Sequence, residues 1–329
     1  MSIQNKPYKI LSIDGGGIRG LIPALILVEI EKRTGKAISE LFDLIAGTST
    51  GGILALGLNI PDHNGKPRYT VEELVTLFKE KGKMIFCQNK WRALMTGLGI
   101  LDERYSHHSF EKLLQEYCGE VELKSAITDV LITSYDLEYT RKPFFFKSRL
   151  AQREEERNFK MKEVIRATTA APTYFEPHKL LNSVNRKIYY SLVDGAIVAN
   201  NPAMCAFAEA LTLNQSDILM VSLGTGAKTE QIKHKDAINW GIVHWIRPLI
   251  TLIMNGNSAA VDYQLKEIFL AKESSDYYRL QVNLPMDDKS VHKLDNTKKS
   301  NLNRLESLTQ ELIAKEDKTI DDICAKLQE

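Results

Sequence analysis

The sequence predicts an α/β fold built around a largely parallel sheet. Short apolar runs of strand length alternate along the chain with apolar or amphipathic runs of helix length. Two of the predicted strands lead directly into glycine-rich turns, at residues 14–20 and 47–51. This alternation is typical of β-α-β units, in which helices cover the faces of a parallel sheet.

The expected elements follow one another through residue 226. The strands are 8–13, 42–46, 127–135, 144–147, 187–193 and 218–223, and the helices are 22–32, 51–58, 70–85, 109–117, 161–171 and 202–213. Pro23 fits the first turn of the first helix and Gly35 fits its C-terminal cap. We expect residues 1–227 to form the core and residues 228–329 to form a helical extension packed on it, with an apolar stripe along 298–328.

The composition is that of a globular chain. Its 329 residues are 43% hydrophobic and 26% charged, which is enough apolar surface for a large core. A net charge of +1 gives no basic field for a phosphate backbone, so we expect no nucleic-acid polymer as a partner. Four cysteines without C-x-x-C spacing indicate free thiols and no zinc site. With no apolar run near the roughly 18 residues of a membrane span, these features favour a cytoplasmic protein.

Ser49 lies in the turn between the second predicted strand and its helix. Gly47 and Gly51 flank it in a G-x-S-x-G pattern, which places a serine on a strained strand-to-helix turn. Side chains at the two glycine positions would collide where the helix folds back beside its strand. The N-terminal amides of that helix would point at a developing oxyanion. Ser49 is therefore the candidate nucleophile.

The first predicted strand ends in a glycine-rich loop, residues 14–20. Successive glycines leave backbone N–H groups free to point at one oxygen, so Gly15, Gly16 and Gly17 are candidates for an oxyanion-binding loop. The loop also fits G-x-G-x-x-G, and a dinucleotide-binding turn is the alternative. Against that alternative, the second strand does not end in the acidic residue that would bind a ribose. Arg19 is expected either to brace the loop or to meet a phosphate head group.

Asp194 follows the predicted strand 187–193. Catalytic groups of open α/β sheets collect at the ends of strands, so Asp194 is a candidate base. With Gly195 it also forms an Asp-Gly pair, which is common in ordinary turns. Because a carboxylate in water is a weak base for a serine, a pair of Ser49 and Asp194 requires a partly dry site.

Two other functions stay open on the residues alone. In an α/β-hydrolase triad, a later histidine would act as the base, and His234, His244 and His292 have the required chain order. The serine comes unusually early for that fold, and no histidine stands in a recognisable catalytic turn. The other alternative is a module that binds a nucleotide or lipid through the glycine loop without catalysis.

The segment 239–255 is apolar at helical spacing but contains Pro248. It predicts either a kinked helix packed on the core, or a lid or interfacial surface. In the second interpretation its tryptophans, Trp240 and Trp245, would favour the headgroup level of a bilayer and give peripheral membrane association.

The chain resembles the patatin-like phospholipase family in three motifs. These are Asp-Gly-Gly-Gly-Ile-Arg-Gly at 14–20, Gly-Thr-Ser-Thr-Gly at 47–51 and Asp-Gly-Ala at 194–196. Further similar stretches lie at 170–177, 199–202 and 222–226, so the resemblance covers roughly residues 7–227. Ala196 stands where the family often has glycine, which is a mild departure.

The resemblance implies a patatin-like three-layer sandwich and a lipid acyl hydrolase of the phospholipase A or lysophospholipase type, with no metal or organic cofactor. Its substrate would be a phospholipid or another acyl ester at a membrane surface. Some bacterial relatives respond to cyclic nucleotides, so an activating small molecule or protein partner is a further expectation. The residue roles that it implies are Ser49 as nucleophile, Asp194 as base, Gly15, Gly16 and Gly17 as oxyanion hole, and Arg19, Gly47, Gly51 and Gly195 as supporting residues.

Overall fold

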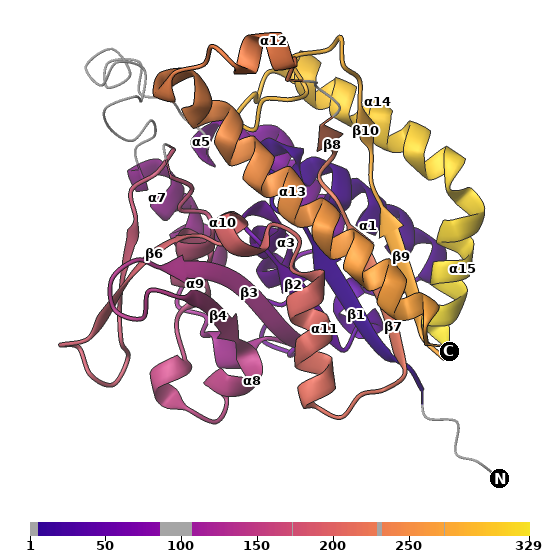
Figure 1. The fold of residues 1–329 in the computed structure, drawn as a ribbon. Helices are drawn as coiled ribbons and strands as arrows, with labels where there is room; N and C mark the ends of the chain where they lie inside the picture. Colours follow the sequence, from indigo (N-terminus) through magenta and orange to yellow (C-terminus); the bar gives the residue numbers. More distant parts are fainter. Residues whose placement is uncertain (1–5, 86–106, 173, 229–231, 273) are drawn as a thin grey trace.

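A computed structural model describes residues 6–85, 107–172, 174–228, 232–272 and 274–329. In it a central sheet lies between two layers of helices (Figure 1). Helices α11 (Ala203–Thr212) and α13 (Ile242–Leu270) cover one face. The other face carries α1 (Leu21–Thr34) with the C-terminal helices α14 (Lys299–Lys315) and α15 (Asp317–Gln328). The expected α/β sandwich is confirmed.

The main sheet is mostly parallel. Its strands lie in the order β5-β6-β3-β2-β1-β7-β9, and β4 pairs with β3 beside this path. The strands β3, β2, β1, β7 and β9 are parallel, whereas β4 and β6 run antiparallel to β3. Their bounds are β1 Tyr8–Ile13, β2 Leu44–Gly47, β3 Asp129–Asp136, β4 Pro143–Lys147, β5 His178–Leu181, β6 Tyr189–Asp194, β7 Ile218–Leu223 and β9 Asp276–Leu280.

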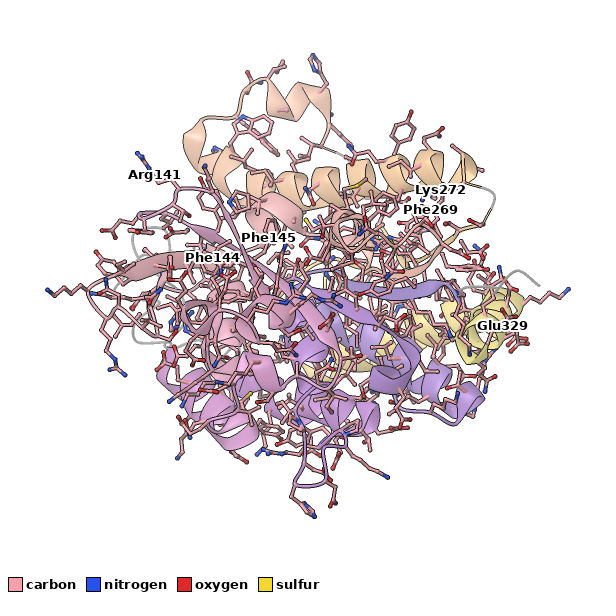
Figure 2. All side chains as sticks on the ribbon, turned by 90° about the horizontal axis from the view of Figure 1, so that it is seen from below. Arg141, Phe144, Phe145, Phe269, Lys272 and Glu329 are labelled. Atoms are coloured by element: carbon pink, nitrogen blue, oxygen red, sulfur yellow. The ribbon has the colours of Figure 1, made fainter. Side chains whose placement is uncertain are left out.

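The central strands bury both faces. Ile10 of β1 and Met220 of β7 belong to the apolar cluster under α11 and α13, whereas their neighbours Leu11 and Val221 belong to the cluster under α1. Strands covered on both sides consist of continuous apolar residues, which is why these two are recognisable from the sequence. Phe269 lies near the C-terminal end of α13 (Figure 2). Its ring packs on Phe207 of α11 with ring centroids 5.5 Å apart.

Residues 228–329 contribute strands as well as helices. β9 pairs in parallel with β7, so the main sheet continues into the segment that we expected to be a helical extension. The short strands β8 (Ala227–Lys228) and β10 (Asn283–Leu284) also pair with each other. Four of the five residues of β9 are only half-buried, so no apolar run marks it in the sequence. The predicted stripe along 298–328 is confirmed, since Leu302, Leu305 and Leu308 are buried.

The predicted helices are present, with two differences: the helix expected at 70–85 contains a π-helical turn at Leu77–Lys81, and the helix expected at 161–171 ends at Thr168. Pro23 lies in the first turn of α1, and Gly35 caps this helix in the left-handed conformation (φ 67°). Pro248 lies inside α13, as expected for segment 239–255. Of the helices within the described ranges, none has both the length and the apolar character needed to cross a bilayer. The other helices are α2 Ile38–Leu41, α3 Thr50–Gly57, α4 Val71–Thr76, a π-helical turn Leu77–Lys81, α5 Gly82–Ile85, α7 His107–Cys118, α8 Ser148–Ala151, α9 Met161–Thr168, α10 Ala196–Ala199 and α12 His234–Ala237.

Candidate active site

Ser49 occupies a strained turn between β2 and α3. Its backbone has φ 55° and ψ −120°, a conformation that residues with a side chain rarely adopt. The Ser49 N–H donates a 2.9 Å hydrogen bond to Thr168 Oγ1, and the Thr168 hydroxyl donates in turn to the carbonyl oxygen of Thr133 at 2.6 Å. Contacts to α9 and β3 therefore hold the serine in this conformation.

The two glycines that flank Ser49 are required by close backbone approach. A Cβ atom at Gly47 would lie 2.4 Å from the carbonyl oxygen of Gly51. A Cβ atom at Gly51 would lie 2.2 Å from the carbonyl oxygen of Ile13. Both distances are far below van der Waals contact, so α3 can pack beside β1 and β2 only with glycine at these positions.

Ser49 and Asp194 are in direct contact. Ser49 Oγ donates a hydrogen bond to Asp194 Oδ2 at 2.7 Å, and Asp194 Oδ1 accepts a 2.8 Å bond from the Ala196 N–H. Gly195 follows without room for a side chain, since a Cβ atom there would lie 2.1 Å from Thr133 Oγ1.

The route by which Asp194 reaches the site differs from the expected one. The rule for strand ends assumed a parallel strand, but β6 runs antiparallel to β3. Asp194 pairs with Ser134, two residues beyond Ile132, which pairs with Gly47 at the end of β2. The carboxylate therefore arrives beside the serine turn from the opposite direction.

Burial sets the acidity of the carboxylate. Asp194 is 3% exposed and Ser49 8% exposed. Desolvation by burial raises the pKa of Asp194 to about 7, against the smaller lowering effects of hydrogen bonds from the Ala196 amide and the Ser49 hydroxyl. A carboxylate with this pKa is a stronger base than one in water and is still substantially ionised near pH 7.

The histidines of the alternative triad lie elsewhere. His234 and His244 are exposed residues of α12 and α13. His292 donates from Nε2 to the carbonyl oxygen of Pro285 at 2.9 Å. Among the described residues, no histidine lines the cavity beside Ser49.

The glycine loop lies against the serine turn. A Cβ atom at Gly15 would be 3.2 Å from Ser49 Cβ, and Gly17, in the left-handed conformation (φ 59°), lines the same cavity as Ser49. The Gly15 N–H donates to the carbonyl oxygen of Asn200 at 3.0 Å, so it is not free to bind an oxyanion, contrary to the expectation of three donors. The amides of Gly16 and Gly17 have no backbone acceptor in the described part of the chain.

Arg19 braces this loop. Its Nε and Nη1 donate to the carbonyl oxygens of Gly16 and Gly226, each at 3.4 Å. The residue is 4% exposed, and burial lowers its pKa to about 10, so it stays charged at neutral pH. Of the two roles expected for Arg19, bracing is the one that the contacts support, because the buried guanidinium is out of reach of a lipid head group.

A buried ion pair supports the start of the loop. Arg279 of β9 donates from Nη1 and Nη2 to Asp14 Oδ1 and Oδ2 at 2.8 and 2.6 Å. Ser258 of α13 donates to Asp14 Oδ2 at 3.2 Å and accepts from Asn200 Nδ2 at 3.0 Å. The backbone carbonyl oxygen of Asn200 in turn accepts the Gly15 N–H.

Arg279 and Ser258 were not identified from the sequence, because nothing in residues 228–329 marked them. The one available signal was Asp14 itself, an acidic residue between an apolar strand and three glycines.

An apolar cavity of about 240 Å³ opens beside Ser49 and Asp194. Its walls come from α3, α5, α10, α13 and residues 169–172 and 174–175, with side chains that include Ile53, Ile85, Phe175, Ile197, Ile250 and Met254. Such a site suits a ligand whose alkyl chain lies along the apolar walls and whose polar group lies at the serine. The described ranges contain no group of three or more His, Cys, Asp or Glu side chains placed to bind a metal ion.

Comparison with known proteins identifies the family of the chain. The sequence model for the patatin-like phospholipase family matches residues 11–207, more than half of the chain. "Probable inactive patatin-3-Kuras 1" of Solanum tuberosum is 34% identical over 300 residues, covering 83% of this chain and 78% of the relative. "Patatin-17" of Solanum cardiophyllum is 33% identical, with 93% and 83% covered. "Patatin-like protein 1" of Arabidopsis thaliana is 31% identical, with 95% and 84% covered. The family motifs, and relatives similar along most of their length, show that the chain belongs to the patatin-like phospholipase family.

Proposed function

We propose that this protein is a lipid acyl hydrolase of the phospholipase A or lysophospholipase type, with Ser49 and Asp194 as its catalytic dyad. The observation that carries the proposal is the 2.7 Å hydrogen bond from Ser49 Oγ to Asp194 Oδ2 beside an apolar cavity. Family membership supports acyl ester hydrolysis as the class of reaction.

The proposed reaction has two steps. As Ser49 Oγ attacks the ester carbonyl carbon, Asp194 Oδ2 accepts the hydroxyl proton. The tetrahedral oxyanion then receives hydrogen bonds from the amides of Gly16 and Gly17. Its collapse expels the alcohol, which takes the proton from Asp194, and leaves the acyl group on Ser49. Water attacks this acyl-enzyme with Asp194 again as base, releasing the fatty acid and restoring Ser49.

Burial makes a dyad without histidine workable. A general base is most effective when its pKa lies near the working pH, and the pKa of Asp194 is raised to about 7. The strained serine turn and the braced glycine loop hold nucleophile and oxyanion donors in place before the substrate arrives, which lowers the reorganisation needed in the transition state.

The surface around the cavity supports a lipid aggregate as the source of substrate. Ile197 and Ile253 line the cavity and are 40% and 41% exposed, and Leu249 and Leu252 on α13 are 48% and 44% exposed. We propose that this apolar rim contacts the membrane surface, so that a cytoplasmic protein associates peripherally and takes an acyl chain directly from the lipid layer. Activation by a cyclic nucleotide or a protein partner stays a prediction from the resemblance, tested by adding such ligands to the assay below.

Hydrolysis of a short chromogenic acyl ester, with and without a serine-directed fluorophosphonate, tests the proposal. We expect turnover that the inhibitor abolishes by labelling Ser49. Product analysis by mass spectrometry on mixed-chain phospholipids then gives the acyl position. Because one relative is named inactive, absence of turnover with ester and phospholipid alike would favour a binding module.

A further inference from the structure

A second apolar cavity lies behind the one beside Ser49. It has a volume of about 30 Å³ and is lined by α3, the helical residues 71–85 and α7. Ile53 and Ile85 line both cavities, so their side chains form the wall between them. Both are buried, with 4% and 2% of their surface exposed.

Ile53 lines the cavity beside Ser49. It lies one helical turn after Ser49, whose carbonyl oxygen accepts the Ile53 N–H at 3.1 Å. The second cavity is apolar, with side chains such as Ile60, Leu74, Leu113 and Ile165. Tyr69 also lines this cavity, and its hydroxyl already donates a 2.8 Å hydrogen bond to the carbonyl oxygen of Tyr117. A small cavity of this kind stays dry, so methylenes that enter it displace no bound water.

We propose that Ile53, together with Ile85, sets the longest acyl chain that the enzyme accepts, by closing the first cavity against the second. This inference rests on the proposed acyl hydrolase function and deepens it. A chain that ends at the wall is fully buried, whereas further methylenes either stay in water or push against Ile53. Removing the side chain would join the two cavities into one longer channel.

Chain-length profiles of three variants test the wall. With p-nitrophenyl esters of 4, 8, 12 and 16 carbons, we expect Ile53→Ala to raise the long-to-short ratio of kcat/KM by about tenfold or more, because it removes three carbons and each newly buried methylene contributes about fourfold. Ile53→Phe should shift the ratio the opposite way. Ile60→Ala is the matched control: it removes the same three carbons from a buried side chain that lines only the second cavity, and should leave the profile unchanged.

The outcomes separate this inference from the proposed function. If Ile53→Ala and Ile53→Phe are folded and hydrolyse short esters with the wild-type profile, or if Ile60→Ala shifts it equally, the wall does not set chain length. Should Ile53→Ala fail to fold, Ile53→Val and Ile53→Phe should still shift the long-to-short ratio of kcat/KM in opposite directions. If no ester is turned over in a Ser49-dependent way, the proposed function has failed. Calorimetry of lauric and palmitic acid binding to the same Ile53 variants, on a Ser49→Ala background, would then still show whether Ile53 limits the length of the bound chain.

Discussion

The hydroxyl of Ser49 donates a 2.7 Å hydrogen bond to the carboxylate of Asp194, although the residues are 145 positions apart and come from strands that run in opposite directions. Strand β3 sets this distance, because it pairs with β2 through Ile132 and with β6 through Ser134. Thr133, between them, shares a 2.6 Å hydrogen bond with Thr48, next to the serine. The pair thus depends on one strand that contributes no reacting group.

Replacing Ser49 should separate catalysis from stability. Ser49→Ala and Ser49→Gly should both abolish ester hydrolysis while the fold is retained. Glycine adopts the observed φ of 55° without strain and alanine does not, so we expect the glycine variant to be more stable than the alanine variant by about 1 kcal/mol. Turnover assays and urea denaturation measure the two effects. Near wild-type turnover in a folded Ser49→Ala protein would refute the nucleophile.

Replacing Asp194 tests the base. Asp194→Asn keeps the size of the side chain and the bond from the Ala196 N–H but cannot accept the serine proton, so we expect kcat to fall by several orders of magnitude. Alanine at His234, His244 or His292 should leave most of the activity, since none of them lines the cavity. A large loss in one of these folded histidine variants would instead support the triad.

The acidity of Asp194 predicts opposite trends of rate and stability with pH. Only the ionised carboxylate is a base, so kcat/KM should rise about tenfold per pH unit up to about pH 7 and then level off. Because burial raises the folded-state pKa from 3.8 to about 7, the folded protein holds this proton more tightly than the unfolded chain. This contribution to the free energy of unfolding is fully present below about pH 4 and is lost as the pH rises to about 7, on the order of 4 kcal/mol in total.

Denaturation of the wild type and of Asp194→Asn at pH 5 and pH 8 measures the contribution of Asp194 to the free energy of unfolding, because the variant lacks the titrating group. The variant should gain stability relative to wild type at the higher pH. Equal stability differences at the two pH values would mean that Asp194 is ionised throughout.

The parts that were predictable from the sequence are those where local rules decide. Strands β1 and β7 have the predicted bounds because both are buried on two faces and end at residues that interrupt the apolar run. Ser49 was identifiable because the turn excludes side chains at Gly47 and Gly51 by contact with nearby backbone. The cause is the burial of the whole strand for β1 and β7, backbone four residues away for Gly47, and the neighbouring strand β1 for Gly51.

The parts that were not predictable depend on distant partners. The direction of β6 is fixed by its pairing with β3 and not by its own residues. The amide of Gly15 is occupied by the carbonyl oxygen of Asn200, a backbone contact that no side-chain pattern encodes. The half-buried residues of β9 gave no periodic signal, although this strand carries Arg279 to Asp14.

A side chain at Gly16 should impair the oxyanion loop. A Cβ atom there would lie 2.2 Å from Thr225 Oγ1. The Thr225 hydroxyl donates a 2.7 Å hydrogen bond to the carbonyl oxygen of Gly15, so Gly16→Ala must displace the loop. We expect kcat to fall by about a hundredfold or more with little change in KM. Gly256→Ala is the control, because it is exposed and a Cβ atom there meets nothing within 4 Å.

Substitutions at Gly16 also distinguish the dinucleotide alternative. Under that alternative, calorimetry would detect saturable NAD binding to the wild-type protein, and Gly16→Val would remove it while esters went unhydrolysed. Ester turnover that falls with Gly16→Ala, without NAD binding, is the result expected here.

Breaking the Asp14–Arg279 pair should cost both stability and turnover. Among the described residues, Arg279→Met leaves the buried Asp14 carboxylate with only the Ser258 hydroxyl as side-chain donor, so we expect a loss of about 3–5 kcal/mol in the free energy of unfolding. Because Asp14 precedes the glycine loop, and Ser258 and Asn200 connect the two, the surviving protein should also lose on the order of tenfold in kcat with KM little changed.

A double-mutant cycle assigns these losses to the pair. Adding Asp14→Asn to Arg279→Met removes the second buried charge, so the double variant should be less destabilised than the sum of the two single variants. Lys266→Met is the control: Lys266 is 57% exposed and pairs with Asp262 one helical turn away, so its loss should cost about 1 kcal/mol or less with unchanged kcat. Additive losses, or a folded Arg279→Met enzyme with wild-type kcat, would show that the glycine loop keeps its position without this ion pair.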